Sequence, residues 1–464
     1  MDLTLEDKNI QLMDSAPIPK AIIKLGIPTV ISSLISVIYN LTDTFFIGLL
    51  DDPIQIGAIS LAFPIFLVIQ ALGTIFSVGA PSYISRCLGS GNHKEVKKTS
   101  SVSFYGVIIM TVIMSALYFL FQNPILKLMG ATAENYEATK SYAGIIVVFA
   151  FTISVQIVLL CLLRAEGKVK ESAMGTMIGT IVNIVFDPIF IFPLKMGAAG
   201  AAWATILGNT CAAVYCILVI LKKNTFLSVS IKDFKVERKI VGEIFRIGLP
   251  SSLTNLVMSI SNILLNNFAS NYGNSAVSAV GVSGKLMTVM TMIIGGYGMG
   301  YLPFVGYNYG AGKMKRVRDS FWFTTISSTI FGLALTIPFW MFGSGFMRVF
   351  TSDEKIIELG VHCLKIYVFC LPVLGLQYTV TSTFQATGKA IFAMFSNLGR
   401  QGIFFIPTII VFKKLFDFYG LIWAQVAADY MAVVLCILLA LPMIKKISKS
   451  VAMAHDGKEE KSNE

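Results

Sequence analysis

Long hydrophobic runs separated by short polar segments make up most of this chain. A helix needs about 20 apolar residues to cross the hydrocarbon core of a membrane, and about twelve runs reach that length. The runs cover residues 22–49, 55–79, 101–121, 139–163, 172–194, 198–221, 245–270, 276–303, 320–343, 355–385, 391–413 and 418–444. The pattern therefore predicts an all-α polytopic membrane protein with twelve transmembrane helices.

The composition agrees with a lipid environment. Hydrophobic residues make up 55% of the 464 positions and charged residues only 14%, whereas soluble domains carry roughly 25% charged residues. These values exclude a disordered chain and an ordinary soluble enzyme. The net charge of +11 is spread over short loops instead of one folded polar surface, so we expect a lipid bilayer and no nucleic acid as the partner.

The basic residues fall almost entirely in alternate loops. One set of loops and termini holds 27 of the 37 Lys and Arg residues, and the other set holds eight. Because positively charged loops stay on the cytoplasmic side, this alternation predicts a multi-pass protein of the cytoplasmic membrane with both termini inside.

The polar segments carry no signature of an enzyme or of an ATP-driven pump. No Gly-Lys pair is followed by Ser or Thr, so the chain has no Walker phosphate-binding loop. Its three histidines are scattered without metal-ligand spacing. The seven cysteines lie in or beside the hydrophobic runs, where we expect them to pack as small apolar residues. We therefore expect no cofactor and no ATP.

The two halves of the chain repeat one another. Gly26-Ile27-Pro28 near the start of the first run corresponds to Gly248-Leu249-Pro250 near the start of the seventh, 222 positions later, and similar matches keep nearly this offset throughout. Six helices per repeat make the halves parallel, related by a pseudo-two-fold axis along the membrane normal. The predicted domains are a six-helix N-lobe (1–221), a cytoplasmic linker (222–244), a six-helix C-lobe (245–446) and a cytoplasmic tail (447–464). Such a pair of lobes favours secondary transport by alternating access.

Two acidic residues lie inside predicted membrane helices, where a carboxylate costs roughly 2.5 kcal/mol or more. Asp43 follows Lys24 by 19 residues and Asp187 follows Lys170 by 17 residues. Both acids therefore lie about 26–28 Å along outward-running helices, in the outer half of the membrane. The second repeat has no acid at either equivalent position. Since the repeated fold does not need these acids, we interpret them as the coupling site.

Neutral oxygen groups accompany the two acids. Asn40 shares a helix face with Asp43, Asn183 shares one with Asp187, and Thr205 lies at the same level near the outer start of the sixth helix. Two carboxylates with neutral oxygens suit a Na⁺ ion held by Asp43 and Asp187, and they equally suit protonation. A purely structural alternative is that the neutral groups hydrogen-bond helices together.

The second half carries a different set of charges at membrane depth: Lys285, Arg400 and Asp429. Lys285 and Asp429 are a possible ion pair. The three residues form a C-lobe polar patch in a substrate cleft, an ion-pair gate, or a structural pair. By contrast, Arg164 and Glu166 at the end of the fourth helix are interpreted as solvated loop charges.

Several motifs carry a resemblance to a known family. They are Asn40-Leu-Thr-Asp43, Asn183-Ile-Val-Phe-Asp187-Pro188, Gly200-Ala-Ala-Trp203-Ala-Thr205, Gly89-Ser-Gly91, Gly310-Ala-Gly312 and Gln385-Ala-Thr-Gly388. Over residues 20 to 445 the chain resembles multidrug and toxic compound extrusion (MATE) transporters, in particular the DinF-like branch and its bacterial multidrug-pump relatives. Other branches have a prominent Glu in helix 7 and Asp in helix 10. This chain has neither, which argues against a coupling site in the C-lobe.

The resemblance and the residues together predict a secondary antiporter. It would exchange H⁺ or Na⁺ for amphipathic, mainly cationic small molecules and act as a monomer. The alternative within the same superfamily is a flippase for lipid-linked precursors, for which the few intramembrane Lys and Arg residues are unfavourable. A channel or a membrane-embedded enzyme are more distant alternatives.

Overall fold

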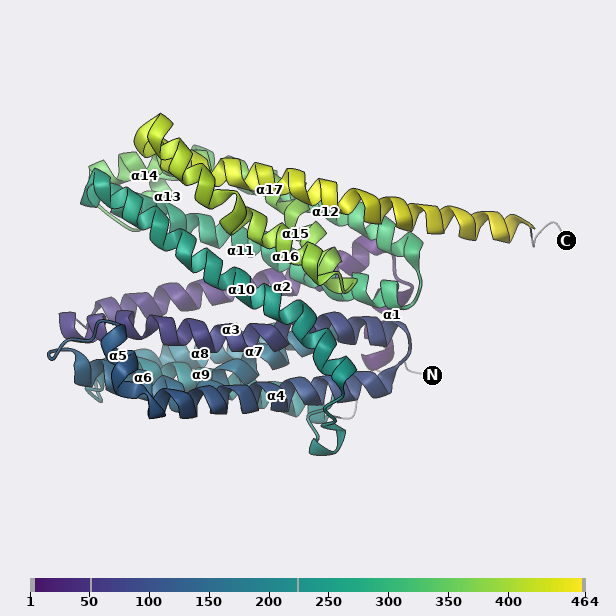
Figure 1. Cartoon of the computed structure of the whole chain (residues 1–464), viewed down its shortest axis with the longest axis horizontal. Helices are drawn as coiled ribbons and strands as arrows, with labels where there is room; N and C mark the ends of the chain where they lie inside the picture. The colour runs from purple at the N-terminus through teal and green to yellow at the C-terminus, as the bar shows by residue number, and fades with distance from the viewer. Residues whose placement is uncertain (1–4, 51, 223–224, 461–464) are drawn as a thin grey trace. The chain divides into compact units, whose positions relative to one another are not determined.

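The structure, a computed structural model, describes residues 5–50, 52–222 and 225–460, and the side chains of residues 9–50, 52–222 and 225–453. The described residues form helices joined by short turns, with no strand among them (Figure 1). The all-α fold class is therefore confirmed. The end of the predicted tail, from residue 454 on, lies outside the described side chains.

The chain divides into two compact units. Unit 1 comprises residues up to Gln11 and Ile31–Ser252, and unit 2 comprises Leu12–Val30 and the chain from Leu253. The helices before the second half are α1 (Leu5–Asp14), α2 (Ile18–Gly48), α3 (Pro53–Gly89), α4 (His93–Leu120), α5 (Gln122–Leu128), α6 (Tyr136–Val148), α7 (Ala150–Ala165), α8 (Val169–Ile191), α9 (Gly197–Leu221) and the 3₁₀ turn η1 (Ile231–Asp233). Those that follow are α10 (Arg238–Ala269), η2 (Ser270–Tyr272), α11 (Asn274–Gly310), α12 (Met314–Met341), α13 (Gly343–Arg348), α14 (Glu354–Tyr367), η3 (Val368–Cys370), α15 (Leu371–Ala386), α16 (Ala390–Leu398), the π-helix η4 (Gly399–Ile403) and α17 (Phe405–Glu460).

The described helices account for the twelve predicted crossings. Ten segments are long and apolar enough to span a membrane, and α6 with α7 adds an eleventh as a span bent by 46°. One of the ten segments, Ala390–Met453, has 64 residues. At 1.5 Å per residue it would reach about 96 Å, roughly three times the hydrocarbon core. The backbone of Asp417 is non-helical within it (φ 56°, ψ −133°) and separates two crossings, as the sequence predicts.

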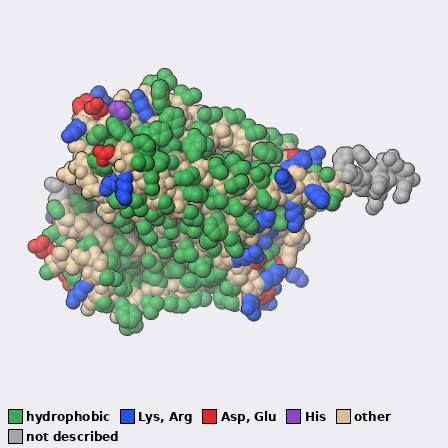
Figure 2. All heavy atoms as spheres, turned by 45° about the horizontal axis from the view of Figure 1, so that its top comes forward, with side chains coloured by type: hydrophobic (Ala, Val, Ile, Leu, Met, Phe, Trp, Pro, Cys, Tyr) green, Lys and Arg blue, Asp and Glu red, His purple; other side chains and the backbone are tan. Residues whose placement is uncertain are grey.

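Large hydrophobic side chains cover the outer surface. Figure 2 shows them over most of the face in view, with Lys and Arg gathered towards its ends. The exposed hydrophobic residues of α4 alone include Ile109, Val112, Ile113, Leu117 and Leu120. A soluble monomer rarely exposes so wide an apolar surface, so these side chains face lipid.

The repeat is visible in the backbone of the turns. Gly91 and Gly312 follow α3 and α11 with φ of +72° and +71°, and Gly167 and Gly388 follow α7 and α15 with φ of +82° and +78°. Glycine adopts this left-handed conformation without steric cost, which explains its use at the ends of these helices.

Two helices, α2 and α10, pass from one unit to the other. The unit boundary falls after Val30 in α2 and after Ser252 in α10, again 222 positions apart and two residues beyond Pro28 and Pro250. Each proline removes a helical hydrogen bond and so weakens the helix just before the boundary.

Close backbone contacts at glycines hold the first halves of these helices in place. A Cβ on Gly300 of α11 would lie 2.6 Å from the Cα of Gly26 in α2 within unit 2, and a Cβ on Gly79 of α3 would lie 2.1 Å from the Ile244 carbonyl oxygen in α10 within unit 1. Both approaches are closer than any larger residue allows. The domain boundaries expected from the sequence stay a prediction. In the structure the first half of α2 groups with unit 2, and the first half of α10 groups with unit 1.

Candidate functional site

Two acidic side chains predicted from the sequence come together in unit 1. Asp43 lies in the C-terminal half of α2 and is partly buried, and Asp187 lies in α8 with no exposed surface. Their carboxylates are close enough to interact electrostatically. A pair of like charges in a water-poor site is unfavourable, so the arrangement favours a bound cation or proton.

Asn183 joins the acid of α8 to the neighbouring helix α9. With its amide oriented to satisfy both neighbours, it donates to Asp187 Oδ2 at 3.0 Å and accepts from the Thr205 backbone N–H at 3.2 Å. The helices can approach this closely because Gly179 and Gly208 face one another, and a Cβ on Gly208 would lie 2.5 Å from the Gly179 carbonyl oxygen. The Asn183 and Thr205 side chains are almost fully buried.

Two tyrosines that sequence reasoning missed complete the cluster. The Tyr39 hydroxyl lies 3.4 Å from Thr205 Oγ1, and both Tyr39 and Tyr142 of α6 lie within electrostatic reach of the two carboxylates. Tyr39 precedes Asp43 by four residues, so its helical spacing was a usable signal. Tyr142 had no such signal, since aromatic residues are common in membrane helices. We call Tyr39, Asp43, Tyr142, Asn183, Asp187 and Thr205 the acidic cluster.

The structure does not bring the Asn40 side chain into the acidic cluster. Asn40 is exposed, and its amide donates to the Ser36 carbonyl of its own helix at 2.7 Å. Of the five residues predicted for coupling, four meet and Asn40 does not. Their roles in coupling stay a prediction.

The atoms that the acidic cluster offers to a cation are oxygens, from carboxylates, an amide carbonyl and hydroxyl groups. Such a set suits a hard monovalent or divalent cation or a proton, and not a soft transition metal. Among the described residues, no group of three His, Cys, Asp or Glu side chains has the arrangement of a metal site.

In unit 2, Asp429 pairs with Arg400 and not with Lys285. Arg400 Nε lies 2.7 Å from Asp429 Oδ1, and the same oxygen accepts from Gln425 Nε2 at 3.0 Å. The Arg400 guanidinium also donates to the Tyr378 hydroxyl at 3.3 Å. Lys285 is exposed, and among the described residues it is Arg400 that forms the ion pair with Asp429. Arg400 lies in the π-helix η4, a form that is rare and often found at functional sites.

Glu166 is buried, which corrects its interpretation as a solvated loop charge. Only 3% of its surface is exposed, and its carboxylate accepts from Thr225 Oγ1 and from the Phe226 N–H, both at 2.6 Å. Lys168 lies 3.6 Å away as an ion pair. The carboxylate thereby holds the segment before α10 against the end of α7 within unit 1. Sequence spacing does not reveal this contact, because the two parts are about 60 residues apart.

We expect Glu166→Ala to loosen this segment, because it removes the acceptor of the hydrogen bonds from Thr225 and Phe226. Losses of this kind destabilise a protein by about 1–3 kcal/mol. Faster amide hydrogen exchange at residues 225–230 would show the effect. Glu171→Ala, in the first turn of α8, is the control and should leave that exchange unchanged. Equal exchange in both variants would contradict the assigned contact.

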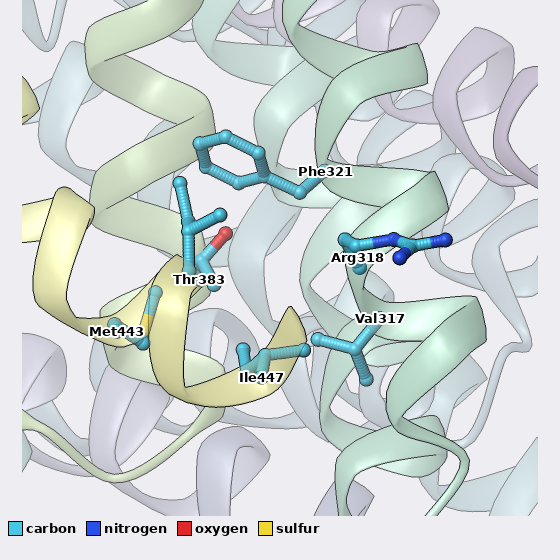
Figure 3. Close-up of a pocket in the computed structure, with 7 residues that line it drawn as sticks. Val317, Arg318, Phe321, Thr383, Met443 and Ile447 are labelled. Atoms are coloured by element: carbon cyan, nitrogen blue, oxygen red, sulfur yellow. The ribbon is translucent and has the colours of Figure 1, made fainter. Parts of the chain in front are cut away.

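A crevice inside unit 2 is too small for a drug-sized molecule. Its volume is ≈ 10 Å³, about the space of one water molecule, whereas ligand pockets usually measure about 300–1,000 Å³. Val317, Phe321 and Met443 line it, and the Arg318 guanidinium points away from it (Figure 3). It is a packing defect between α12, α15 and α17.

Comparison with known proteins extends these findings. The MatE family model matches the chain twice, at residues 28–189 and 250–411, once in each repeat. The multidrug export protein MepA of Staphylococcus aureus (strain MRSA252) is 32% identical over 425 residues, covering 92% of this chain and 94% of MepA. MepA of Staphylococcus haemolyticus (strain JCSC1435) is also 32% identical, over 426 residues.

Solved structures share the fold over nearly the whole chain. A multidrug resistance MATE family transporter of the MOP superfamily, in an outward-facing conformation, has a TM-score of 0.91 at 25% identity and covers 97% of this chain and 100% of its own. A MOP superfamily transporter from Pyrococcus furiosus Vc1 (DSM3638) has a TM-score of 0.88, also at 25% identity, and covers 97% of this chain and 100% of its own.

Proposed function

The chain belongs to the MatE family of membrane transporters, and on this premise we propose that it exports amphipathic, mainly cationic compounds in exchange for H⁺ or Na⁺. The observation that carries the proposal is the acidic cluster, in which Asp43 and the fully buried Asp187 share one water-poor site. The names of the relatives, multidrug export proteins, support a transporter over an enzyme and do not favour a flippase for lipid-linked precursors.

The acidic cluster supports a mechanism in which the coupling ion moves α2. Asp43 stands on the outer half of α2, while Asn183, Asp187 and Thr205 stand on the closely packed pair α8 and α9. A proton or Na⁺ neutralises the repulsion between the two carboxylates and so draws Asp43 towards α8. Loss of the ion restores the repulsion. The outer half of α2 thereby responds to the ion gradient, and the substrate path changes with it.

The energy for export comes from that gradient, since the sequence contains no phosphate-binding loop. The distribution of Lys and Arg favours both termini in the cytoplasm, and one chain holds the complete acidic cluster, which supports a functional monomer.

Proteoliposomes test the function and identify the ion. The purified chain is reconstituted with a fluorescent lipophilic cation, and a Na⁺ gradient at equal pH or a pH gradient at equal Na⁺ is imposed. We expect saturable dye transport with one of the two gradients and its loss when an ionophore collapses that gradient. Protein-free liposomes and a neutral dye are the controls. Transport that depends on neither gradient, or a flux that does not saturate with dye concentration, would argue against an antiporter.

A further inference from the structure

A groove on unit 1 follows the length of α6, between the end of α4 and the start of α9. Its volume is ≈ 450 Å³, within the range of about 300–1,000 Å³ that is usual for small-molecule sites. Figure 1 shows α5 and α6 together at one end of the unit. We name it the α6 groove; its lining includes Phe119, Glu137, Lys140, Val148, Phe149 and Trp203. Unlike the crevice in unit 2, it has room for a ligand.

The polarity of the α6 groove changes along its length. Glu137 and Lys140 stand between the polar segment 122–138 and the predicted crossing 139–163, so this end lies at a membrane surface. Val148 lies about 16 Å further along the helix and is 49% exposed.

Aromatic rings form the rest of the lining. The rings of Phe149 and Trp203 lie 5.2 Å apart, and Phe119 at the end of α4 is 45% exposed. A groove with charged groups at the membrane surface and apolar groups beyond them fits an amphipathic molecule that lies along α6.

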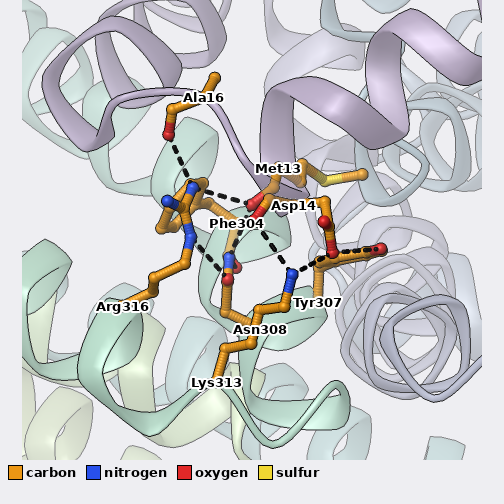
Figure 4. A network of polar contacts seen from close by, with 8 residues as sticks. All are labelled: Met13, Asp14, Ala16, Phe304, Tyr307, Asn308, Lys313 and Arg316. Atoms are coloured by element: carbon orange, nitrogen blue, oxygen red, sulfur yellow. Dashed lines mark hydrogen bonds and ion pairs between the residues drawn. The ribbon is translucent and has the colours of Figure 1, made fainter.

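The two charged residues of the α6 groove differ from other charged clusters of the protein. At the start of α2, for example, Asp14 accepts from Lys313 Nζ at 2.5 Å and from the Tyr307 hydroxyl at 3.1 Å (Figure 4). Among the described residues, the side chains of Glu137 and Lys140 have no ion pair or hydrogen bond. They are three residues apart on one helix face, with about 5–6 Å between their Cβ atoms. An acid and a base at this spacing can contact the ammonium and the phosphate of one zwitterionic group.

The second repeat shows where an ammonium group lies in the equivalent part of unit 2. Since α12 and α13 begin 221 positions after α4 and α5, Phe119 corresponds to Trp340 and Gly144 to Lys365. Lys365 Nζ lies over the Trp340 ring, 5.3 Å from its centroid. Gly144 lines the α6 groove without a side chain, and a Cβ there would have no atom within 4 Å. The face of Phe119 is thus accessible to the ammonium of a ligand.

We propose that the α6 groove binds one phospholipid with an ammonium headgroup, of the phosphatidylethanolamine class. The ammonium contacts the Glu137 carboxylate and the face of Phe119, and the phosphate contacts Lys140. An acyl chain follows α6 past Val148. Lys140 favours this occupant over a simple organic cation, which its charge would repel. The site does not depend on which compound the protein exports or on which ion drives the export.

Native mass spectrometry of the full-length protein in detergent tests the headgroup preference. The protein is titrated with phosphatidylethanolamine or with phosphatidylglycerol of the same acyl chains, which has the phosphate without the ammonium. We expect the wild type to bind phosphatidylethanolamine about tenfold more tightly, and Glu137→Gln to lose most of this preference. Glu134→Gln is the matched control, since Glu134 is exposed just before α6 and does not line the groove.

Two further variants separate the ammonium contact from the phosphate contact. Gly144→Lys introduces the side chain that Lys365 provides in unit 2, so it should weaken binding of phosphatidylethanolamine by about tenfold. Gly144→Ala is its control, because it adds only a methyl group. Lys140→Gln should weaken binding of both phospholipids by a similar factor, since both carry the phosphate. Equal unfolding temperatures without added lipid would show that all the variants are folded.

Three outcomes would overturn the proposal. The first is equal binding of the two phospholipids by the wild type, and the second is an unchanged preference in Glu137→Gln and Gly144→Lys. The third is displacement of phosphatidylethanolamine by tetraphenylphosphonium that becomes easier in Lys140→Gln, which would assign the groove to organic cations. Failure of the proposed function is distinguishable, because proteoliposomes would then show no gradient-driven transport while the headgroup preference persists.

Discussion

Asp187→Asn is expected to abolish the dependence of dye efflux on the ion gradient. The substitution keeps the size of the buried side chain and removes the charge that a proton or Na⁺ neutralises. Coupling between two ligands usually corresponds to about 1–3 kcal/mol, or a 5- to 150-fold effect. Efflux driven by the effective gradient should therefore fall by about that factor. Transport rates in proteoliposomes at several gradient strengths measure it.

Asp43→Asn should reduce coupling in the same way, and the double variant should be little worse than either single one, because the carboxylates act as a pair. Thr44→Val is the matched control: Thr44 is exposed at the next position of α2, and its hydroxyl donates to the Asn40 carbonyl of its own helix. Normal gradient dependence in both Asp variants would remove the acidic cluster as the coupling site.

Arg400→Met is expected to destabilise unit 2 strongly. Asp429 has no exposed surface, and the substitution removes the group that balances its charge at 2.7 Å. Breaking a buried ion pair in this way costs about 3–5 kcal/mol. A lower unfolding temperature in detergent would measure the loss.

The double variant Arg400→Met/Asp429→Leu separates a structural role from a functional one. Replacing both members of a buried pair by apolar residues is often neutral or stabilising. We therefore expect near-normal stability in the double variant. If its gradient-driven efflux is also normal, the pair is structural; if efflux is lost while stability is kept, the pair takes part in transport. Lys285→Gln is the control, because Lys285 is exposed and outside the pair.

The helices and the acids were predictable because an alternative placement of either is costly. A long apolar run is unfavourable in water, and a carboxylate is unfavourable within the membrane unless it has a function. An apolar run of about 20 residues is compatible with few folds other than a membrane helix. The gap between the predicted runs 391–413 and 418–444 contains the break that the structure has at Asp417. Asp43 and Asp187 were predictable as a pair because depth along a helix follows directly from residue number.

Rotation around a helix was harder to predict than depth. Lys285, Arg400 and Asp429 have similar depths, yet only Arg400 faces Asp429. The π-helix η4 inserts extra backbone beside Arg400 and turns the residues that follow, which an ideal helical repeat does not anticipate. Tyr142 was missed and Glu166 was misinterpreted for another reason: their partners lie on other elements of unit 1, and only the folded structure brings them together.

The contact between Gly26 and Gly300 has a consequence for the order of assembly. Synthesis runs from the N-terminus, so Gly26 enters the membrane well before α11 exists. The first half of α2 therefore waits for its partner in unit 2 while most of unit 1 is made. Unit 1, in turn, is complete only when residues 238–252 of the second repeat have been added. Neither half of the gene therefore encodes a finished half of the protein.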